Sequence, residues 1–169
     1  MRIIKSETIT ETIKELCIKG ACHLPADVYN RLLEAISTED SPVSKHTLEI
    51  LKENADIAAS NQEPICQDTG MACVFLEIGQ DVPFVGGDLT DAINEGVRQG
   101  YTEGYLRKSV VNDPVFDRIN TKDNTPAIIH YDIVPGDQLK ITVAPKGFGS
   151  ENMCQVKMLK PSDGIEGVK

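Results

Sequence analysis

The sequence predicts an α+β fold, in which N-terminal helices are followed by a mixed or antiparallel sheet flanked by helices. In the first third of the 169 residues, the apolar side chains recur at helical spacing. The remainder holds apolar runs of strand length and one further helical pattern, separated by glycine and proline turn signals. Helices that precede a mixed series of strands and helices favour α+β over a doubly wound parallel sheet.

Three helices are expected in the first third of the chain. Ile9, Ile13 and Leu16 lie at helical spacing in the first of them. The second runs over about residues 25–36 with a proline near its first turn, and Ser41-Pro42 opens the third. We expect the apolar side chains of the third helix to be buried: Leu48, Leu51, Ala55, Ile57 and Ala58.

The later elements form the predicted sheet and its flanking helix. A dense apolar run predicts a strand over 71–78. Asp88 then begins a helix that extends to about residue 105, because its side chain can accept hydrogen bonds from early helix amides. Two further strands, over 127–134 and 138–143, are joined by the turn sequence Pro135-Gly136-Asp137.

Composition restricts the class of protein. The formal net charge of −9 at pH 7, without a basic stripe, disfavours binding to nucleic acid and to anionic membranes. No apolar run approaches the ~20 residues of a membrane span, and the N-terminus lacks the apolar core of a signal peptide. We therefore expect a cytoplasmic protein whose five cysteines are reduced thiols or metal ligands.

The most informative segment is the loop Pro-Ile-Cys-Gln-Asp-Thr-Gly over residues 64–70. Pro64 fixes its own φ and Gly70 permits a turn that a side chain would hinder, so the loop is stiff as well as polar. It can present Cys66, Gln67 and Asp68 for chemistry. From the residues alone, Cys66 could be a buried thiol, a nucleophile or a metal ligand.

The other cysteines and the histidines have ordinary structural interpretations. Cys17 and Cys73 fit as small buried side chains, one in an amphipathic helix and one in an apolar strand. The C-x4-C spacing of Cys17 and Cys22 is weak evidence for a metal site. A nucleophilic cysteine needs a nearby base, and the candidates are His23, His46 and His130. We expect His130 to lie on a solvent-facing strand surface.

Two further segments could bind an anion. In the loop over 146–152, glycines let backbone amides approach a ligand, and a helix expected from Ser150 or Glu151 would add partial positive charge. A plain strand-to-helix turn is the alternative. Arg107 could hold a carboxylate with two hydrogen bonds, although a surface arginine is the ordinary interpretation of such a residue.

Four blocks of sequence occur here in one order: Pro-Ile-Cys-Gln-Asp-Thr-Gly at 64–70, Tyr-Leu-Arg-Lys-Ser at 105–109, Asn-Thr-Pro at 124–126, and Lys-Gly-x-Gly-Ser-Glu-Asn at 146–152. This series resembles the α subunit of the class I, iron–sulfur-dependent fumarate hydratases and the related L-tartrate dehydratases. The resemblance continues through residues 158–164 and so covers nearly all of the chain.

The resemblance implies a [4Fe–4S] cluster held by three cysteine thiolates, with one iron acting as a Lewis acid on the substrate. Cys66 matches the first cluster ligand. Gln67, Asp68 and Arg107 match substrate-binding residues, and the loop containing Gly149 matches backbone near the bound ligand. The resemblance also leaves His130 as a possible wall residue of the site. Cys154 stands where the family usually has a small residue, so it is not expected to be a ligand.

The resemblance also implies what the sequence does not contain. The other two ligand cysteines and the catalytic base would belong to a downstream region, a β subunit or a C-terminal domain. We therefore expect residues 1–169 to be a single domain, the N-terminal portion of an α subunit, truncated before the remaining ligands and inactive by itself. An oligomer with the β partner is expected.

The implied reaction is the reversible hydration of a small dicarboxylate, fumarate to L-malate. Dehydration of L-tartrate is the alternative within the family. A non-catalytic assembly or binding module with the same fold also stays open, as does a cysteine hydrolase if a histidine lies within hydrogen-bond reach of Cys66.

Overall fold

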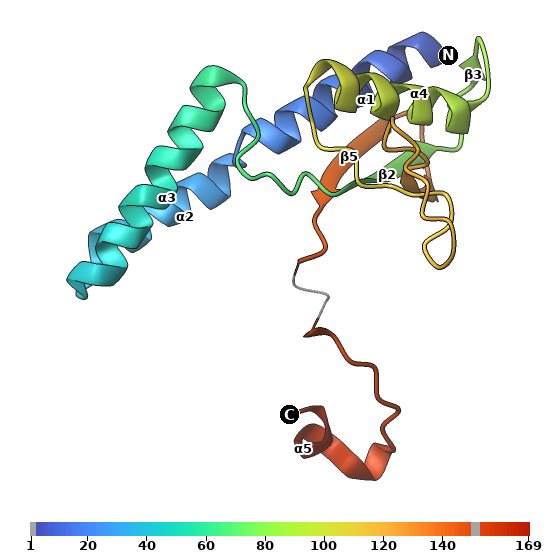
Figure 1. Ribbon diagram of the computed structural model, residues 1–169. Coiled ribbons are helices and arrows are strands. Elements are labelled where there is room, and N and C mark those ends of the chain that lie inside the picture. The colour runs from blue at the N-terminus through green and yellow to red at the C-terminus, as the bar shows by residue number, and fades with distance from the viewer. Residues whose placement is uncertain (1–2, 150–152) are drawn as a thin grey trace.

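The computed structural model describes residues 3–149 and 153–169 and confirms the α+β class (Figure 1). The elements, in chain order, are β1 (Ile4–Lys5), α1 (Ser6–Cys22), α2 (Ala26–Thr38), α3 (Pro42–Asn61), β2 (Met71–Gly79), β3 (Phe84–Val85), α4 (Leu89–Glu103), β4 (Ile128–Val134), β5 (Leu139–Lys146), η2 (Pro161–Asp163) and α5 (Gly164–Val168). The helices and strands predicted over residues 6–146 are present, with small shifts at their ends.

The main sheet is mixed, as predicted, with the strand order β4-β2-β5. The central strand β2 pairs in parallel with β4 and antiparallel with β5, so that Val74 lies between Ile129 and Val143. A second, two-stranded sheet joins β1 to β3 in parallel. This small pair was not predicted, because strands of two residues leave no periodicity in the sequence.

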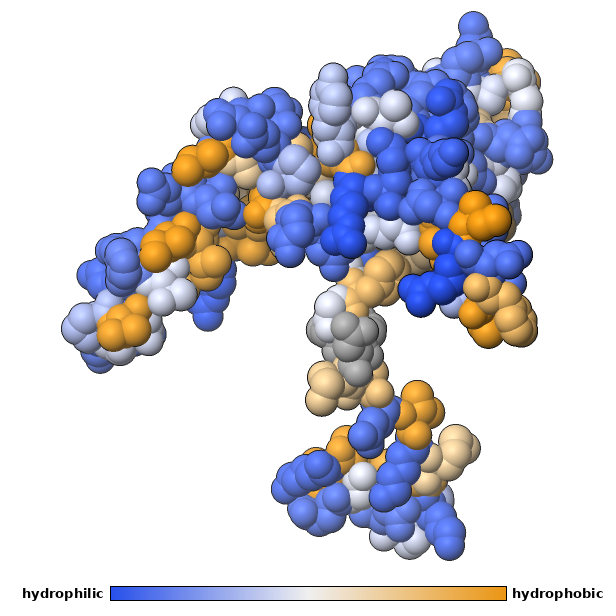
Figure 2. Space-filling view, in the orientation of Figure 1, coloured by the Kyte–Doolittle hydropathy of each residue, from blue (hydrophilic) through white to orange (hydrophobic). Residues whose placement is uncertain are grey.

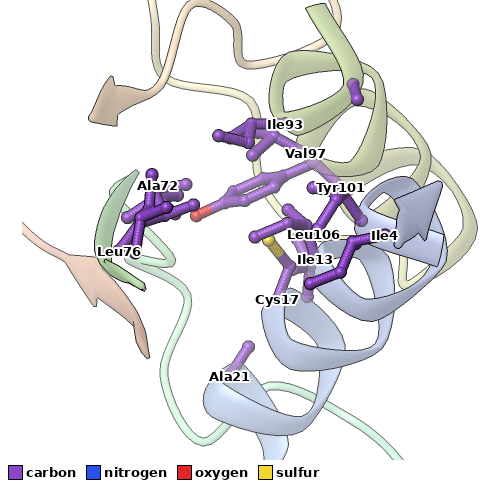
Figure 3. Close-up of a cluster of buried hydrophobic side chains, with 14 of the residues drawn as sticks. Ile4, Ile13, Cys17, Ala21, Ala72, Leu76, Ile93, Val97, Tyr101 and Leu106 are labelled. Atoms are coloured by element: carbon purple, nitrogen blue, oxygen red, sulfur yellow. The ribbon is translucent and has the colours of Figure 1, made fainter. Parts of the chain in front are cut away.

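One face of the sheet packs against α1 and α4 and forms the core. The inward side chains of β2 meet apolar side chains of both helices around the buried ring of Tyr101 (Figure 3). The central members are Ile9, Ile13, Cys17, Val74, Leu76, Ile93, Val97 and Tyr101. Close packing of the helices depends on Gly100, where an added Cβ would lie 2.8 Å from the Cβ of Cys17. The core thus holds α4 and β2 in place. The segment that follows α4 and the segment that precedes β2 therefore each have one fixed end.

The opposite face of the sheet is partly exposed in the described chain. Phe75 is 44% exposed, and its ring stacks on His130 with 4.9 Å between the ring centroids. His130 is itself exposed, which confirms the expectation that it faces solvent. Cys73 lies on the same face of β2 as Phe75 and is only half-buried, whereas the sequence predicted a buried side chain.

The helices α2 and α3 form a hairpin that projects from the rest of the molecule (Figure 1). The expected burial of α3 is wrong for Leu51 and Ile57, which are 52% and 49% exposed, and right for Ala55 and Ala58. A helix that packs mainly against one neighbour buries only one stripe of its surface. Apolar side chains consequently remain at the surface of the hairpin (Figure 2).

The segment over 153–169 lies apart from the sheet and helices (Figure 1). The start of the helix expected at Ser150 or Glu151 falls outside the described residues, and residues 154–160 are not helical. Met153, Val156 and Met158 are all about nine-tenths exposed or more, at 88%, 98% and 91%. Among the described helices, none combines the length and apolar character that a membrane crossing requires.

Candidate functional site

The loop that carries Cys66 is tied to the ends of two helices. After α3 ends, Gln62 takes a left-handed conformation with φ 56° and turns the chain toward α1. The backbone amide of Ile65 donates to the carbonyl of Ala21 at 3.0 Å, and Asn54 Nδ2 donates to the carbonyl of Ile65 at 3.0 Å. These bonds fix the backbone immediately before Cys66.

The thiol of Cys66 is exposed at a surface concavity of about 520 Å³. Its Sγ donates to Gln67 Oε1 at 3.2 Å. The concavity is lined by Glu63, Pro64, Cys66, Gln67, Thr69, Tyr105 and Arg107. Three of the residues singled out from the sequence, Cys66, Gln67 and Arg107, therefore lie around one depression although Arg107 comes from a separate segment.

Asp68 has a different position from its two neighbours. Its Oδ1 accepts a hydrogen bond from the amide of Gly70, and its Oδ2 accepts one from the amide of Phe148, each at 3.2 Å. The carboxylate therefore joins the Cys66 loop to the glycine loop that follows β5, and it does not line the concavity. Its role as a substrate contact stays a prediction.

Gly149 lies in the same glycine loop, next to Phe148. It is exposed, and an added Cβ would meet no atom within 4 Å. The loop continues through residues that lie outside the described part of the chain, which include Ser150 of the predicted anion-binding segment. The prediction that this backbone approaches a ligand stays untested.

The backbone of Arg107 is bonded to the Cys66 loop. Thr69 is buried, and its Oγ1 donates to the carbonyl of Arg107 at 3.0 Å. The buried hydroxyl of Tyr101 in turn donates to the carbonyl of Thr69 at 2.9 Å. Burial raises the pKa of the Tyr101 phenol, so the hydroxyl keeps the proton that it donates.

Asn124 makes a second connection between the same two segments. It is fully buried, and its Oδ1 accepts from the amides of Ser109 at 2.6 Å and Val110 at 3.2 Å. Its Nδ2 donates to the carbonyl of Gly70 at 3.0 Å. Sequence reasoning noted the Asn-Thr-Pro block but missed these roles of Asn124, Thr69 and Tyr101. The only local signal was an asparagine shortly before a proline, which indicates a turn.

Comparison with known proteins identifies the family. Residues 10–169 match the family model described as fumarate hydratase (fumerase). The chain belongs to the fumarate hydratase family. The resemblance drawn from the four sequence blocks is thereby confirmed.

Relatives within the fumarate hydratase family are named as α subunits. The chain is 42% identical over 165 residues to a Methanocaldococcus jannaschii protein named "Putative L(+)-tartrate dehydratase subunit alpha", covering 95% of this chain and 58% of the relative. It is 30% identical over 164 residues to the L(+)-tartrate dehydratase subunit alpha of Escherichia coli strain UTI89, covering 95% of this chain and 53% of the relative. The chain thus spans little more than half the length of these relatives.

The described residues of this fumarate hydratase family member offer one candidate thiol ligand and not a complete ligand set for a metal cluster. Cys66 offers an exposed thiol at an open concavity, which suits a ligand shared with another segment. Over residues 3–149 and 153–169, no group of three or more histidine, cysteine, aspartate or glutamate side chains is arranged to hold a metal ion. Cys154 is exposed on the segment that lies apart from the sheet.

The remaining cysteines are poorly placed for chemistry. Cys17 and Cys22 are buried, and burial raises the pKa of the Cys17 thiol from its ordinary 9.0 to about 12. The weak metal alternative for this pair gains no support, because no described group of three or more histidine, cysteine or acidic side chains that could hold a metal ion includes it. Among the described residues no histidine lines the concavity, and Cys66 Sγ bonds Gln67, so the cysteine hydrolase alternative gains no support.

Proposed function

We propose that this chain is the N-terminal portion of the α subunit of a cytoplasmic hydro-lyase, which interconverts fumarate and L-malate. The observation that carries the proposal is the shared concavity of Cys66, Gln67 and Arg107. A thiol, an amide and a guanidinium that line one open depression suit a metal cluster next to a small dicarboxylate. Membership of the fumarate hydratase family supports the reaction class.

The proposed cofactor is a [4Fe–4S] cluster with Cys66 as one of its three thiolate ligands. When bound, such a cluster supplies a Lewis acid that polarises the carbon–oxygen bond of the substrate. The remaining two thiolates and the catalytic base would come from a downstream region or from a β subunit. The subunit names of the relatives agree with a two-part enzyme.

The residues of this chain would bind and orient the substrate. The planar guanidinium of Arg107 can donate two parallel hydrogen bonds to a carboxylate, which fixes the plane of that group as well as its position. Gln67 can donate from its amide to a second substrate oxygen, and Asp68 holds the glycine loop with Gly149 beside the Cys66 loop. An exposed thiol also suits a reducing compartment.

Dehydration of L-tartrate is the second candidate reaction. It is favoured by the names of relatives that are 42% and 30% identical to this chain. L-Tartrate and L-malate share two carboxylates and differ by one hydroxyl group, so Arg107 can hold either. The side chains that sense the extra hydroxyl would lie outside the described concavity.

The test is an activity assay of the assembled protein. The chain is produced with its downstream region and β partner, iron and sulfide are restored without oxygen, and fumarate hydration and L-tartrate dehydration are measured. We expect turnover of one of these substrates by the assembly and no turnover by residues 1–169 alone. An intact cluster that acts on neither substrate would overturn the hydro-lyase proposal.

The same preparation tests the non-catalytic alternative. Sedimentation velocity with and without the β partner shows whether the chain assembles, and iron analysis shows whether a cluster forms. Stable assembly without any cluster would favour an assembly module with the same fold. Assembly together with cluster formation and turnover would favour the enzyme.

A further inference from the structure

Side-chain hydrogen bonds join the backbone segment that carries Cys66 to the segment that carries Arg107. The residues that make these bonds have no proposed role in binding the cluster or the substrate. Cys66 lies on the loop between α3 and β2, and Arg107 lies on the segment after α4. Both side chains are exposed, so neither packs into the core to define its own place. Their relative position therefore depends on how the two backbones are connected.

The first connection runs through Thr69. This side chain is only 5% exposed, and its hydroxyl reaches the carbonyl of Arg107 itself, at 3.0 Å. The carbonyl of Thr69 accepts from the hydroxyl of Tyr101, whose ring is anchored in the core between α4 and β2 (Figure 3). Thr69 thus links the Cys66 loop on one side to the Arg107 backbone and on the other to the rigid core.

The second connection runs through Asn124. Its buried side-chain amide makes three hydrogen bonds. It accepts two from backbone amides of the segment that follows Arg107 and donates one to the Gly70 carbonyl. An asparagine amide offers an acceptor and two donors in one plane, so it can bridge two backbones that do not bond to each other directly. Asn124 has a φ of 65°, in the left-handed region that asparagine tolerates better than most residues, and it lies on a chain segment outside both loops.

We propose that Thr69 and Asn124 are positioning residues, which set the placement of the Arg107 guanidinium relative to the Cys66 thiolate. The inference rests on the proposed function, because it concerns the same dicarboxylate site. A small dicarboxylate can meet a metal cluster and an arginine together only if their separation matches its length. Small displacements of such groups cost large factors in rate or affinity.

The first test compares Thr69→Val with Thr69→Ser in the assembled, cluster-loaded enzyme. Valine has nearly the shape of threonine but cannot donate to the Arg107 carbonyl, whereas serine retains the hydroxyl. We expect Thr69→Val to raise KM about tenfold with a smaller change in kcat, because a displaced Arg107 guanidinium would bind the substrate carboxylate less well. Cluster absorbance should stay at the wild-type level because Cys66 is retained. Thr69→Ser should restore the wild-type KM.

The second test compares Asn124→Ala with Asn120→Ala. Asn120 also bonds backbone, within the segment over 108–122. Its Nδ2 donates to the Lys108 carbonyl at 3.0 Å, and its Oδ1 accepts from the Lys122 amide at 2.7 Å. It makes no described bond to the Cys66 loop. Hydrogen exchange should therefore accelerate over 64–70 and at the Ser109 and Val110 amides for Asn124→Ala. For Asn120→Ala it should accelerate within 108–122 and keep the wild-type rate over 64–70.

The outcomes separate this inference from the proposed function. A wild-type assembly without turnover would overturn the function, and the exchange experiment would still decide whether the two segments are coupled. An unchanged KM in Thr69→Val, or a raised KM that serine does not restore, would overturn the positioning role. Equal rates of amide hydrogen exchange over residues 64–70 in the Asn124→Ala and Asn120→Ala proteins would also overturn it.

Discussion

Gly70 lies directly against the backbone of Lys146: a Cβ added at Gly70 would come within 1.9 Å of the Lys146 carbonyl oxygen. Gly70 also has a φ of 59°, in the left-handed region that favours glycine. The end of the Cys66 loop therefore crosses the end of β5 at a distance that only a glycine permits. This contact brings the loop and the glycine loop after β5 together.

Replacement of Gly70 by alanine should destabilise the fold. We expect Gly70→Ala to lower the free energy of unfolding by about 2–4 kcal/mol, because it combines backbone strain with a clash against main chain. Gly136→Ala is the matched control, since its φ is 96° but an added Cβ there meets no atom within 4 Å. The control should lose only about 1–2 kcal/mol. Urea unfolding measures both, and equal losses would contradict the close contact.

Stability should fall at alkaline pH through the Cys17 thiol. Burial raises the pKa of this thiol from 9.0 to about 12, so between these values the unfolded chain loses a proton that the folded chain keeps. The stabilising contribution is complete below pH 9 and is lost as the pH rises toward 12. One proton gives at most about 1.4 kcal/mol per pH unit.

Cys17→Ala tests this pH dependence. The variant should be less stable at pH 7.5 by about 1–2 kcal/mol, because a buried sulfur is removed from the core. Its further loss of stability between pH 9 and 10.5 should be smaller than that of the wild type. Urea unfolding at the three pH values measures the difference, and parallel losses in the two proteins would contradict the burial effect.

Arg107 should act mainly in substrate binding. Arg107→Lys retains the positive charge but loses the planar pair of donors, so we expect KM to rise about tenfold or more with a smaller effect on kcat. The folded stability should be unchanged because the side chain is exposed. Steady-state kinetics on the assembled enzyme measures this, with Arg31→Lys on the distant α2 as the control. A wild-type KM in Arg107→Lys would exclude bidentate binding.

Asp68 should hold the glycine loop. In Asp68→Ala the Phe148 amide loses its acceptor, so its hydrogen exchange should accelerate about tenfold. Asp137→Ala, in the turn between β4 and β5, removes an exposed carboxylate that does not bond this amide. An equal rate of hydrogen exchange at the Phe148 amide in both variants would show that the bond to Asp68 does not protect this amide.

The sequence predicted those parts of the fold that local chemistry determines. Asp88 begins α4 as expected, and its Oδ1 accepts from the Asp91 amide at 3.0 Å. The alternation of β2 places Val74 and Leu76 in the core. Cys66 and Gln67 are neighbours in the chain, so the sequence also predicted that they lie at the same site.

Contacts between distant segments were beyond sequence reasoning. Asn124 bonds the Gly70 carbonyl across 54 residues, and no periodicity or motif links such a pair. The exposure of Leu51 and Ile57 was missed for a related reason, because a helical pattern identifies an apolar stripe but not the element that covers it. The hydrogen bond from the Phe148 amide to the Asp68 carboxylate likewise spans 80 residues, and no sequence pattern indicated it.

The most direct test of the central claim is the visible absorbance of the iron–sulfur cluster in Cys66→Ser, measured after anaerobic reconstitution of the assembled protein. We expect the absorbance to be lost in Cys66→Ser and kept in Cys154→Ser, with both proteins folded by circular dichroism. A Cys66→Ser protein that retains the cluster absorbance would contradict the assignment of Cys66 as a cluster ligand.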